Sequence, residues 1–403
     1  MCQQASADLA EQPLTPHVSG TNSHVGIVVN AVPTFESLLA PRARNPFTGS
    51  MRIGILSPQP PTQGGLARFG AGLSKALQDA GHQVSVIPVA DGPTASECVD
   101  RLNQSDVAVI QHHDEVYGSV HGDDLLAVLA TLRVPSVLVA HSVPKSPAPH
   151  QRWVIEQIAV AANRVVVMSN AACERLATEY AAERAKIVMI PRGAAVPTSP
   201  RSRRASRPTI LTWGFLREGK GIERVIDAMV SLRDVPGRPR YLVVGQTDPA
   251  VSSVEGEAYR EALAARVTQH GLEGTVEIDG RFYDDSSLVE LVQSVSAVVL
   301  PYDSTDKVTS GVLVDALVRG RPVVSTAFPY AVELLSGGAG IVVDHDDPDA
   351  LVAALRRVLT QPRVAGAMSA EARRLAPQMA WPVVGRAYAD LARQLLAERR
   401  VHG

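Results

Sequence analysis

The sequence predicts an α/β protein made of two doubly wound, parallel-sheet domains that face each other across a cleft. The chain has 403 residues, which exceeds the usual size of a single hydrophobic core and makes two domains the natural expectation. From Met51 onward, short apolar segments alternate with segments of helical periodicity. The apolar segments are continuous rather than alternating in polarity, which is typical of parallel strands buried on both faces.

The first series of strands and helices covers residues 51–196. Leu66, Phe69, Leu73 and Leu77 recur at the spacing of one helix face, directly after the first strand. Polar residues, glycine or proline bound each strand of this series. The predicted strands are Arg52–Ser57, Val84–Val89, Asp106–Gln111, Ser136–His141, Arg164–Ser169 and Lys186–Ile190.

A linker and a second series follow. Residues 197–208 are rich in proline, serine and arginine and predict an interdomain linker with solvated charges; a phosphate contact for its arginines is the weaker alternative. The second series covers residues 209–380, and one long amphipathic helix from Trp381 to Arg400 ends the chain. The predicted strands of this series are Thr209–Gly214, Tyr241–Gly245, Thr275–Ile278, Ala297–Pro301 and Pro322–Thr326.

Charge and cysteine content narrow the class of protein. The 39 Lys and Arg residues against 41 Asp and Glu give a formal net charge of −2, without the basic excess of proteins that bind nucleic acid. We therefore expect no nucleic-acid partner. Cys2, Cys98 and Cys173 have neither zinc-binding nor redox spacing, and their odd number argues against a disulfide framework. This usage is typical of a reducing compartment, so we expect a cytoplasmic protein.

The sequence contains no pattern of a transmembrane segment or a secretion signal. The longest apolar runs, such as Val134–Ala140, fall far below the roughly 20 residues that a membrane helix needs. The first 50 residues lack a basic start followed by a long apolar core. Their content of Ser, Pro, Gln and Asn predicts a disordered N-terminal extension over residues 1–50. Peripheral contact with a membrane stays open.

Two loops that follow predicted strands have the composition of anion sites. Gly64 and Gly65 let the backbone approach a ligand at a helix N-terminus, although an ordinary turn is the alternative. Arg217 and Lys220 stand in the loop Gly214–Gly221, directly ahead of the next helix. Each charge-assisted hydrogen bond to a phosphate contributes about 1.5–3 kcal/mol. Surface charge in a loop is the alternative for these two cations.

A third group of polar residues follows a strand of the second series. Tyr302 comes directly after the strand, and Thr309, Ser310 and Gly311 precede a predicted helix. Their hydroxyls and the helix N-terminal amides suit a phosphate, and capping of the helix by Thr309 or Ser310 is compatible with that role. Asp315 lies one turn further into the helix, where a carboxylate can reach the two hydroxyls of a ribose.

His141 ends a buried strand of the first series. At the edge of the expected cleft, its imidazole can bond a sugar hydroxyl or support a leaving group; a purely structural role is the alternative. His112 and His113 end another strand of the same sheet and make this edge polar.

The acidic pairs elsewhere in the chain predict helix starts and turns rather than a metal site. These pairs are Asp123-Asp124, Asp284-Asp285 and Asp346-Asp347. We therefore expect no metal, and no serine or cysteine nucleophile has a recognisable setting.

Together these segments resemble the retaining GT-B glycosyltransferases of family 4, also called glycosyl transferases group 1. The resemblance covers nearly everything from Met51 onward and is strongest from Thr209 to Val343. Gly214–Gly221 is similar to the family's G-x-x-R-x-x-K-G loop, Pro301-Tyr302 with Ser310-Gly311-Val312 and Gly320–Val324 to its P-Y…S-G-V…G-x-P-V-V segment, and Ile190–Gly193 to its I-P-x-G element.

The resemblance implies a GT-B fold, in which two Rossmann-like domains bind the acceptor (residues 51–196) and the donor (residues 209–380). It also implies that a C-terminal helix (residues 381–403) crosses back to the first domain. The implied activity is a metal-independent hexosyl transfer, of mannose or glucose type, from a GDP- or UDP-linked sugar and without a further cofactor. The acceptor would be a glycan, a lipid-linked molecule or a small molecule.

The resemblance assigns roles to the candidate residues. Gly65, beside Gly64, would approach the donor phosphate, His141 would contact the transferred sugar, Arg217 and Lys220 would hold the diphosphate, Ser310 and Gly311 beside Thr309 would add a hydroxyl or amides, and Asp315 would bind the ribose. Arg192, Lys307 and Tyr302 are further candidates within or beside the matched motifs.

Two departures from the family pattern leave alternatives open. Where many relatives have E-x7-E, this chain has Lys307 and Asp315, with Asp306 beside the lysine. Lys307 is either part of the site or faces solvent. Where many relatives have Gly-Gly ahead of a glutamate, this chain has the aromatic segment Phe328–Glu333. The alternatives to a transferase are a nucleotide-sugar epimerase of the same fold and a catalytically silent protein that binds nucleotide sugars.

Overall fold

The computed structural model describes residues 49–59, 64–89, 94–113, 122–197 and 207–402. The predicted N-terminal extension therefore lies outside the described residues except for its last two positions. The central part of the predicted linker, residues 198–206, also lies outside them.

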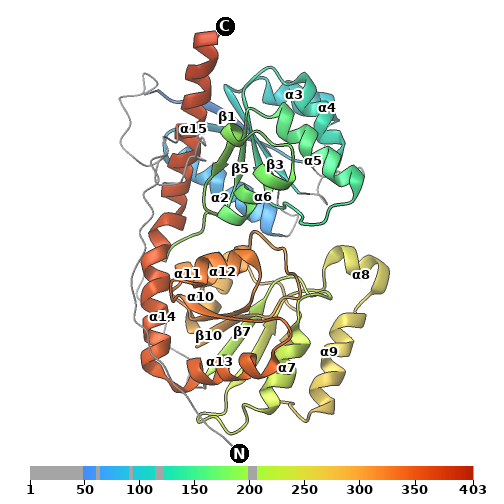
Figure 1. Ribbon diagram of the computed structural model, residues 1–403, viewed down its shortest axis with the longest axis vertical. Coiled ribbons are helices and arrows are strands. Elements are labelled where there is room, and N and C mark those ends of the chain that lie inside the picture. The colour runs from blue at the N-terminus through green and yellow to red at the C-terminus, as the bar shows by residue number, and fades with distance from the viewer. Residues whose placement is uncertain (1–48, 60–63, 90–93, 114–121, 198–206, 403) are drawn as a thin grey trace, which may run out of the picture. The chain divides into compact units, whose positions relative to one another are not determined.

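The first half of the described chain alternates strands and helices from residue 52 to residue 189 (Figure 1). Its elements are β1 (Arg52–Leu56), α2 (Gly65–Asp79), β2 (Gln83–Ile87), α3 (Ala95–Leu102), β3 (Val107–His112), α4 (Asp124–Thr131), β4 (Ser136–Ala140), α5 (Pro149–Ala161), β5 (Arg164–Val167), α6 (Asn170–Glu179), a 3₁₀ turn (Arg184–Lys186) and β6 (Ile187–Met189).

The second half repeats this alternation and ends in three helices. Its elements are β7 (Thr209–Trp213), α7 (Ile222–Val230), β8 (Arg240–Val244), α8 (Pro249–Glu255), α9 (Ala258–Gln269), β9 (Val276–Asp279), α10 (Asp285–Ser294), β10 (Ala297–Leu300), α11 (Gly311–Val318), β11 (Val323–Thr326), α12 (Pro329–Leu335), β12 (Gly340–Val343), α13 (Pro348–Thr360), α14 (Pro362–Leu375), a 3₁₀ turn (Ala376–Met379) and α15 (Trp381–His402).

Each half contains one six-stranded sheet. The strand order is β2-β1-β3-β4-β5-β6 in the first and β12-β11-β10-β7-β8-β9 in the second. All neighbouring strands are parallel. The predicted fold class, two doubly wound parallel-sheet domains, is therefore confirmed. The eleven strands expected from the sequence are all present, with ends that differ by at most two residues.

One strand, β12, is not among those predicted from the sequence. It has four residues, pairs with β11 at the edge of the sheet, and three of its four side chains are only partly buried. A strand this short with one covered side has too few buried apolar positions to produce a recognisable pattern.

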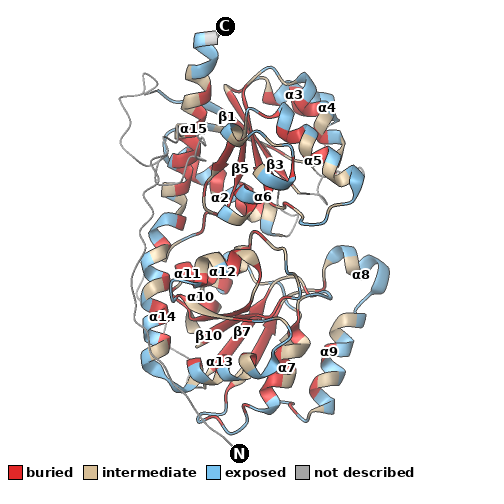
Figure 2. Cartoon of the chain, in the orientation of Figure 1, coloured by how far each residue is buried: buried red, intermediate tan, exposed pale blue. Residues whose placement is uncertain are grey.

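Successive residues along the central strands point to different hydrophobic cores, which explains their continuous apolar sequences. In β3, Val107 and Val109 face one core with α2 and α15, whereas Ala108 and Ile110 face the other. The second sheet is covered on both faces in the same way. Figure 2 shows the resulting pattern, with buried strands and helices exposed on their outer faces.

The C-terminal helix α15 packs against α2 of the first half. Val384, Tyr388 and Leu391 belong to the same core as Ile53 and Phe69. The start of the helix also contacts the first half, because the ring centroid of Trp381 lies 5.4 Å from that of Phe69.

The order of strands reverses at one point in each sheet, and both points position loops that carry candidate residues. In the first sheet, β1 lies between β2 and β3; in the second, β7 lies between β10 and β8. At such a point, the loops after two neighbouring strands run to opposite faces of the sheet. They therefore separate and leave a crevice at the carboxyl ends of the strands. The loops after β1, β7 and β10 meet these conditions.

Candidate functional site: a cationic cleft at the strand ends

One cleft of about 600 Å³ brings the candidate residues together. Its lining comes from loops at the carboxyl ends of strands in both sheets. All the residues selected from the sequence line it, namely Gly64, Gly65, His141, Arg192, Arg217, Lys220, Tyr302, Lys307, Thr309, Ser310, Gly311 and Asp315. Their shared location is therefore established, while their individual roles stay predictions.

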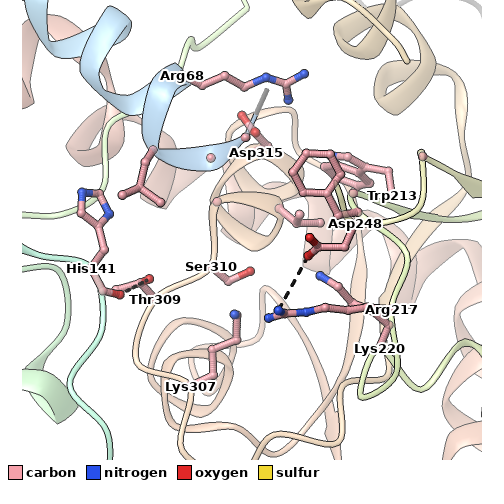
Figure 3. A pocket seen from close by; sticks show the side chains of 18 of the residues that line it. Arg68, His141, Trp213, Arg217, Lys220, Asp248, Lys307, Thr309, Ser310 and Asp315 are labelled. Carbon is pink, nitrogen blue, oxygen red and sulfur yellow. Dashed lines mark hydrogen bonds and ion pairs between the residues drawn. The ribbon is translucent and has the colours of Figure 1, made fainter. Parts of the chain in front are cut away.

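Two cations from the β7 loop line the cleft, and one of them lies over an aromatic ring from the β10 loop. Lys220 Nζ lies 5.0 Å from the centroid of the Tyr302 ring, and Arg217 Nη1 lies 3.7 Å from Asp248 Oδ2. Because β7 and β10 are neighbours in the sheet, these two loops are adjacent at the strand ends. Figure 3 shows the cationic ends of Arg217, Lys220 and Lys307 gathered beside Ser310. This arrangement can bind a polyanion of the size of a diphosphate.

The N-terminus of α11 completes this side of the cleft. Ser310 is the N-cap, and its Oγ accepts a hydrogen bond from Leu313 N at 3.2 Å. Of the two predicted caps, Ser310 is therefore the one observed. Thr309 instead donates its hydroxyl to the carbonyl oxygen of His141 at 3.1 Å, which links this loop to the end of β4. The free amides that begin with Gly311 add a partial positive charge.

Asp315 lies on the first turns of α11 and is held by a neighbour on the same helix. Its Oδ1 accepts a hydrogen bond from Arg319 Nη1 at 2.7 Å, and the Arg319 side chain is buried. A ribose that binds Asp315 therefore meets a carboxylate with a fixed orientation and a remaining acceptor capacity.

His141 presents a neutral imidazole at the end of β4. The residue is 6% exposed, and its Nε2 has no hydrogen-bond partner among the described residues. The ring of Phe69 contacts it edge-on at 4.9 Å between centroids. Burial, with the nearby Arg192, holds the pKa of His141 well below its usual value. A neutral imidazole in this position can exchange a hydrogen bond with a hydroxyl group of a ligand.

Arg192 occupies a slot between the first turns of α2 and α11. Its Nη2 donates to the carbonyl oxygen of Gly65 at 2.8 Å, and its guanidinium carbon lies 5.3 Å from the centroid of the Phe69 ring. A Cβ atom at Gly311 would come within 3.0 Å of Arg192 Nε. The absence of a side chain at Gly311 therefore makes room for the buried cation.

Lys220 carries a shifted pKa. The residue is half-buried where it lines the cleft. Burial, followed by the neighbouring charges of Lys307 and Arg217, lowers the pKa of Lys220 to about 7. Near neutral pH and without a ligand, the Lys220 amine is therefore protonated in only part of the molecules.

We expect the binding of a diphosphate ligand in this cleft to take up protons. A bound diphosphate stabilises the charged ammonium and raises the pKa of Lys220, so above pH 7 the complex holds more protons than the free protein. Affinity should therefore fall as the pH rises above about 7, by up to about tenfold per pH unit until the pKa of the complex is reached. Calorimetry at pH 8 in two buffers of different ionisation enthalpy measures the uptake directly.

The Lys220→Met variant provides the control for this titration. This variant should bind the same diphosphate ligand, but with a proton uptake close to zero. Uptake of the same size in the variant would assign the proton to another group.

Several residues that line the cleft are not among those predicted from the sequence. Asp248 caps α8 after β8 and pairs with Arg217, a position that the strand-end rule could have indicated. Arg68 on α2 approaches Asp285 on α10, with Nε 3.1 Å from Oδ1. Trp213 and Phe282 add aromatic surface. For Arg68, only the tertiary structure supplies the signal, because its partner lies more than 200 residues away in the chain.

Within the described ranges, three or more His, Cys, Asp or Glu side chains nowhere gather in a way that could hold a metal ion. In the same part of the chain, no helix has both the length and the apolar composition required to span a bilayer.

The second half of the chain is similar to a family of known proteins. Residues 207–361 match the model of the family described as "Glycosyl transferases group 1". A D-inositol 3-phosphate glycosyltransferase from Kineococcus radiotolerans is 29% identical over 279 residues, which cover 63% of this chain and 62% of that protein. The chain thus matches less than two thirds of this relative's length.

Solved structures show the same architecture. A sucrose-phosphate synthase from Thermosynechococcus elongatus superposes with a TM-score of 0.69 and 19% identity, covering 86% of this chain and 99% of that one. HepE from Anabaena, solved in complex with UDP-glucose, superposes with a TM-score of 0.66 and 18% identity, covering 88% and 100%. At this level of identity, the structures establish the fold, which is GT-B.

Proposed function

We propose that this chain transfers a hexose from a nucleotide-diphosphate sugar to an acceptor hydroxyl with retention of anomeric configuration. The chain has the GT-B fold, and its residues 207–361 match the model of the glycosyl transferases group 1 family. The donor would be a GDP- or UDP-linked sugar of glucose or mannose type. The acceptor would be a glycan, a lipid-linked molecule or a small molecule. HepE, solved with UDP-glucose, makes this donor the first to test.

The observation that carries the proposal is the cationic cluster at the reversal point of the second sheet. Arg217 and Lys220 line the cleft, and the ammonium of Lys220 lies over the Tyr302 ring. The N-terminus of α11, with Ser310 as its N-cap, borders the same space. Electrostatic stabilisation of this kind lowers a reaction barrier where negative charge develops. The departing diphosphate of a nucleotide sugar is a group on which such charge develops.

The proposed step is a front-face displacement. The bond between the anomeric carbon and the diphosphate oxygen breaks while the acceptor oxygen approaches from the same face. A new bond forms between the anomeric carbon and the acceptor oxygen, and the acceptor proton passes to an oxygen of the departing diphosphate. Arg217, Lys220 and the α11 amides stabilise the leaving group, and we propose that the reaction needs no metal ion.

The other candidate residues would orient the two substrates. His141 would bond a hydroxyl of the transferred sugar through its available Nε2, because its neutral form can donate or accept. Asp315 would accept hydrogen bonds from the ribose. Gly65, at the first turn of α2, would let the backbone approach the diphosphate.

The test begins with a thermal-shift screen of GDP, UDP, ADP and their sugars, since only a nucleotide that binds the folded protein raises its melting temperature. The stabilising donor is then incubated with an acceptor panel, and the anomeric configuration of the product is read by NMR. Transfer with retention is the expected result. Binding without transfer or donor hydrolysis would favour a silent binding protein, and an epimerised sugar would favour an epimerase.

A parallel incubation in EDTA tests the proposed metal independence. We expect the rate to be unchanged. Complete loss of activity that Mg²⁺ or Mn²⁺ restores would refute this part of the proposal.

A further inference from the structure

A third cation, Lys307, lies beside the pair Arg217 and Lys220. Its Nζ is 5.7 Å from the centroid of the Tyr302 ring, and Lys220 Nζ is 5.0 Å from the same centroid. Figure 3 shows the Lys307 ammonium directed toward the guanidinium of Arg217 and the hydroxyl of Ser310. Lys307 is half-buried and lines the cleft beside Arg217 and Ser310.

The backbone around Lys307 is anchored on both sides. The carbonyl oxygen of Lys307 accepts from Tyr330 N at 3.2 Å, and that of Asp306 accepts from Arg175 Nη1 at 2.9 Å. Thr309, two residues further on, donates to His141 O at 3.1 Å. A side chain on an anchored backbone needs little rearrangement to meet a ligand, which is the condition for effective electrostatic stabilisation.

The charges of the substrate distinguish two stages of the reaction. The two phosphates of a nucleotide sugar carry two negative charges, whereas a released nucleoside diphosphate carries a third above a pKa of ~6. Lys307 adds a positive charge beside Arg217 and Lys220, where a third negative charge of a released diphosphate can be stabilised. Of the acids that line the described cleft, Asp248 pairs with Arg217 and Asp315 with Arg319, whereas Asp306 accepts a hydrogen bond from Ser304 Oγ at 3.0 Å.

We propose that Lys307 is a further catalytic residue whose ammonium contacts the terminal phosphate of the departing nucleoside diphosphate and stabilises the charge that appears as the sugar leaves. This inference rests on the proposed function. An interaction that strengthens during bond cleavage raises turnover more than it raises affinity for the intact donor. A residue that binds the sugar hydroxyls already stabilises the intact donor before the bond breaks. Lys307 therefore acts differently from such a residue.

The experiment compares Lys307→Met and Lys307→Arg with the wild type and with Lys75→Met. Lys75 is an exposed lysine on α2 that pairs with Asp79 at 3.0 Å and does not line the cleft, so it controls for the loss of one positive charge. Steady-state rates give kcat and KM for the donor. Calorimetry near pH 7.5 gives Kd for the nucleoside diphosphate and for the intact nucleotide sugar.

We expect Lys307→Met to lower kcat by about 10- to 100-fold with little change in KM. It should also weaken the nucleoside diphosphate about tenfold more than the nucleotide sugar, while Lys307→Arg retains most activity and Lys75→Met retains all of it. Equal weakening of both ligands, an unchanged kcat, or a shift in preference among sugars would overturn the inference. The binding comparison needs no turnover, so it separates a failure of this inference from a failure of the proposed function.

Discussion

Replacing Lys220 with alanine should lower turnover by about 10²–10³-fold while the protein stays folded. The ammonium of Lys220 is held over the Tyr302 ring at 5.0 Å, at the loop that leads into α7. It is thus preorganised beside the predicted diphosphate position, and alanine leaves the developing charge without this partner. The comparison of kcat/KM for the two proteins, with the melting temperature of each, measures the effect.

Lys220→Arg provides the matched variant, because it restores the charge with a different shape. We expect it to recover part of the lost rate, since guanidinium also binds phosphate but fits the ring and the loop less well. Near-normal activity of Lys220→Ala in a folded protein would remove this residue from the phosphate role. Arg217 and Lys307 would then be the remaining cations beside Tyr302 to which a phosphate role could be assigned.

Gly221→Ala should both destabilise the second half and abolish donor binding. Gly221 is the N-cap of α7 with φ of 63°, a conformation that costs an L-residue about 1–2 kcal/mol. A Cβ atom there would also overlap the carbonyl oxygen of Pro301, a backbone atom that cannot rotate away. Overpacking of this kind adds about 1–3 kcal/mol. Urea unfolding and calorimetry with the donor measure the two effects.

Gly219→Ala separates the two causes. Gly219 lies in the same loop with φ of 80°, and a Cβ atom there would have no neighbour within 4 Å. Its cost should be limited to the backbone conformation, about 1–2 kcal/mol. If both variants lose the same stability, the close approach of the β7 and β10 loops is not the reason for glycine at 221.

The local parts of the fold could be predicted from the sequence because their causes are local. A strand buried on both faces needs an unbroken apolar segment, as in β3, and a helix that covers a sheet needs apolar residues on one side, as in α2. Glycines and cations that directly follow a strand end are also local features of the sequence, and they indicated the predicted anion site. The edge strand β12 escaped prediction because its partial burial leaves no such pattern.

The residues of the site could be nominated, but not their environment. The pairing of Arg217 with Asp248, the slot that holds Arg192 between Gly65 and Gly311, and the direction of Lys307 all depend on contacts between distant segments. The depressed pKa of Lys220 depends on them as well, because its burial and the nearby charge of Lys307 come from the tertiary structure, whereas Arg217 is in the same loop. Their effects on activity stay predictions for the variants described above.

The sequence by itself determined which segments are strands and helices and which loops carry glycine, hydroxyl and cationic groups, since periodicity and backbone preference act over a few residues. Only the tertiary structure decided that the β7 and β10 loops are neighbours, that Ser310 caps α11 while Thr309 reaches His141, and that Lys307 joins Arg217 and Lys220. Strand order and burial arise from contacts across the whole chain, and charges acquire their function only where those contacts place them.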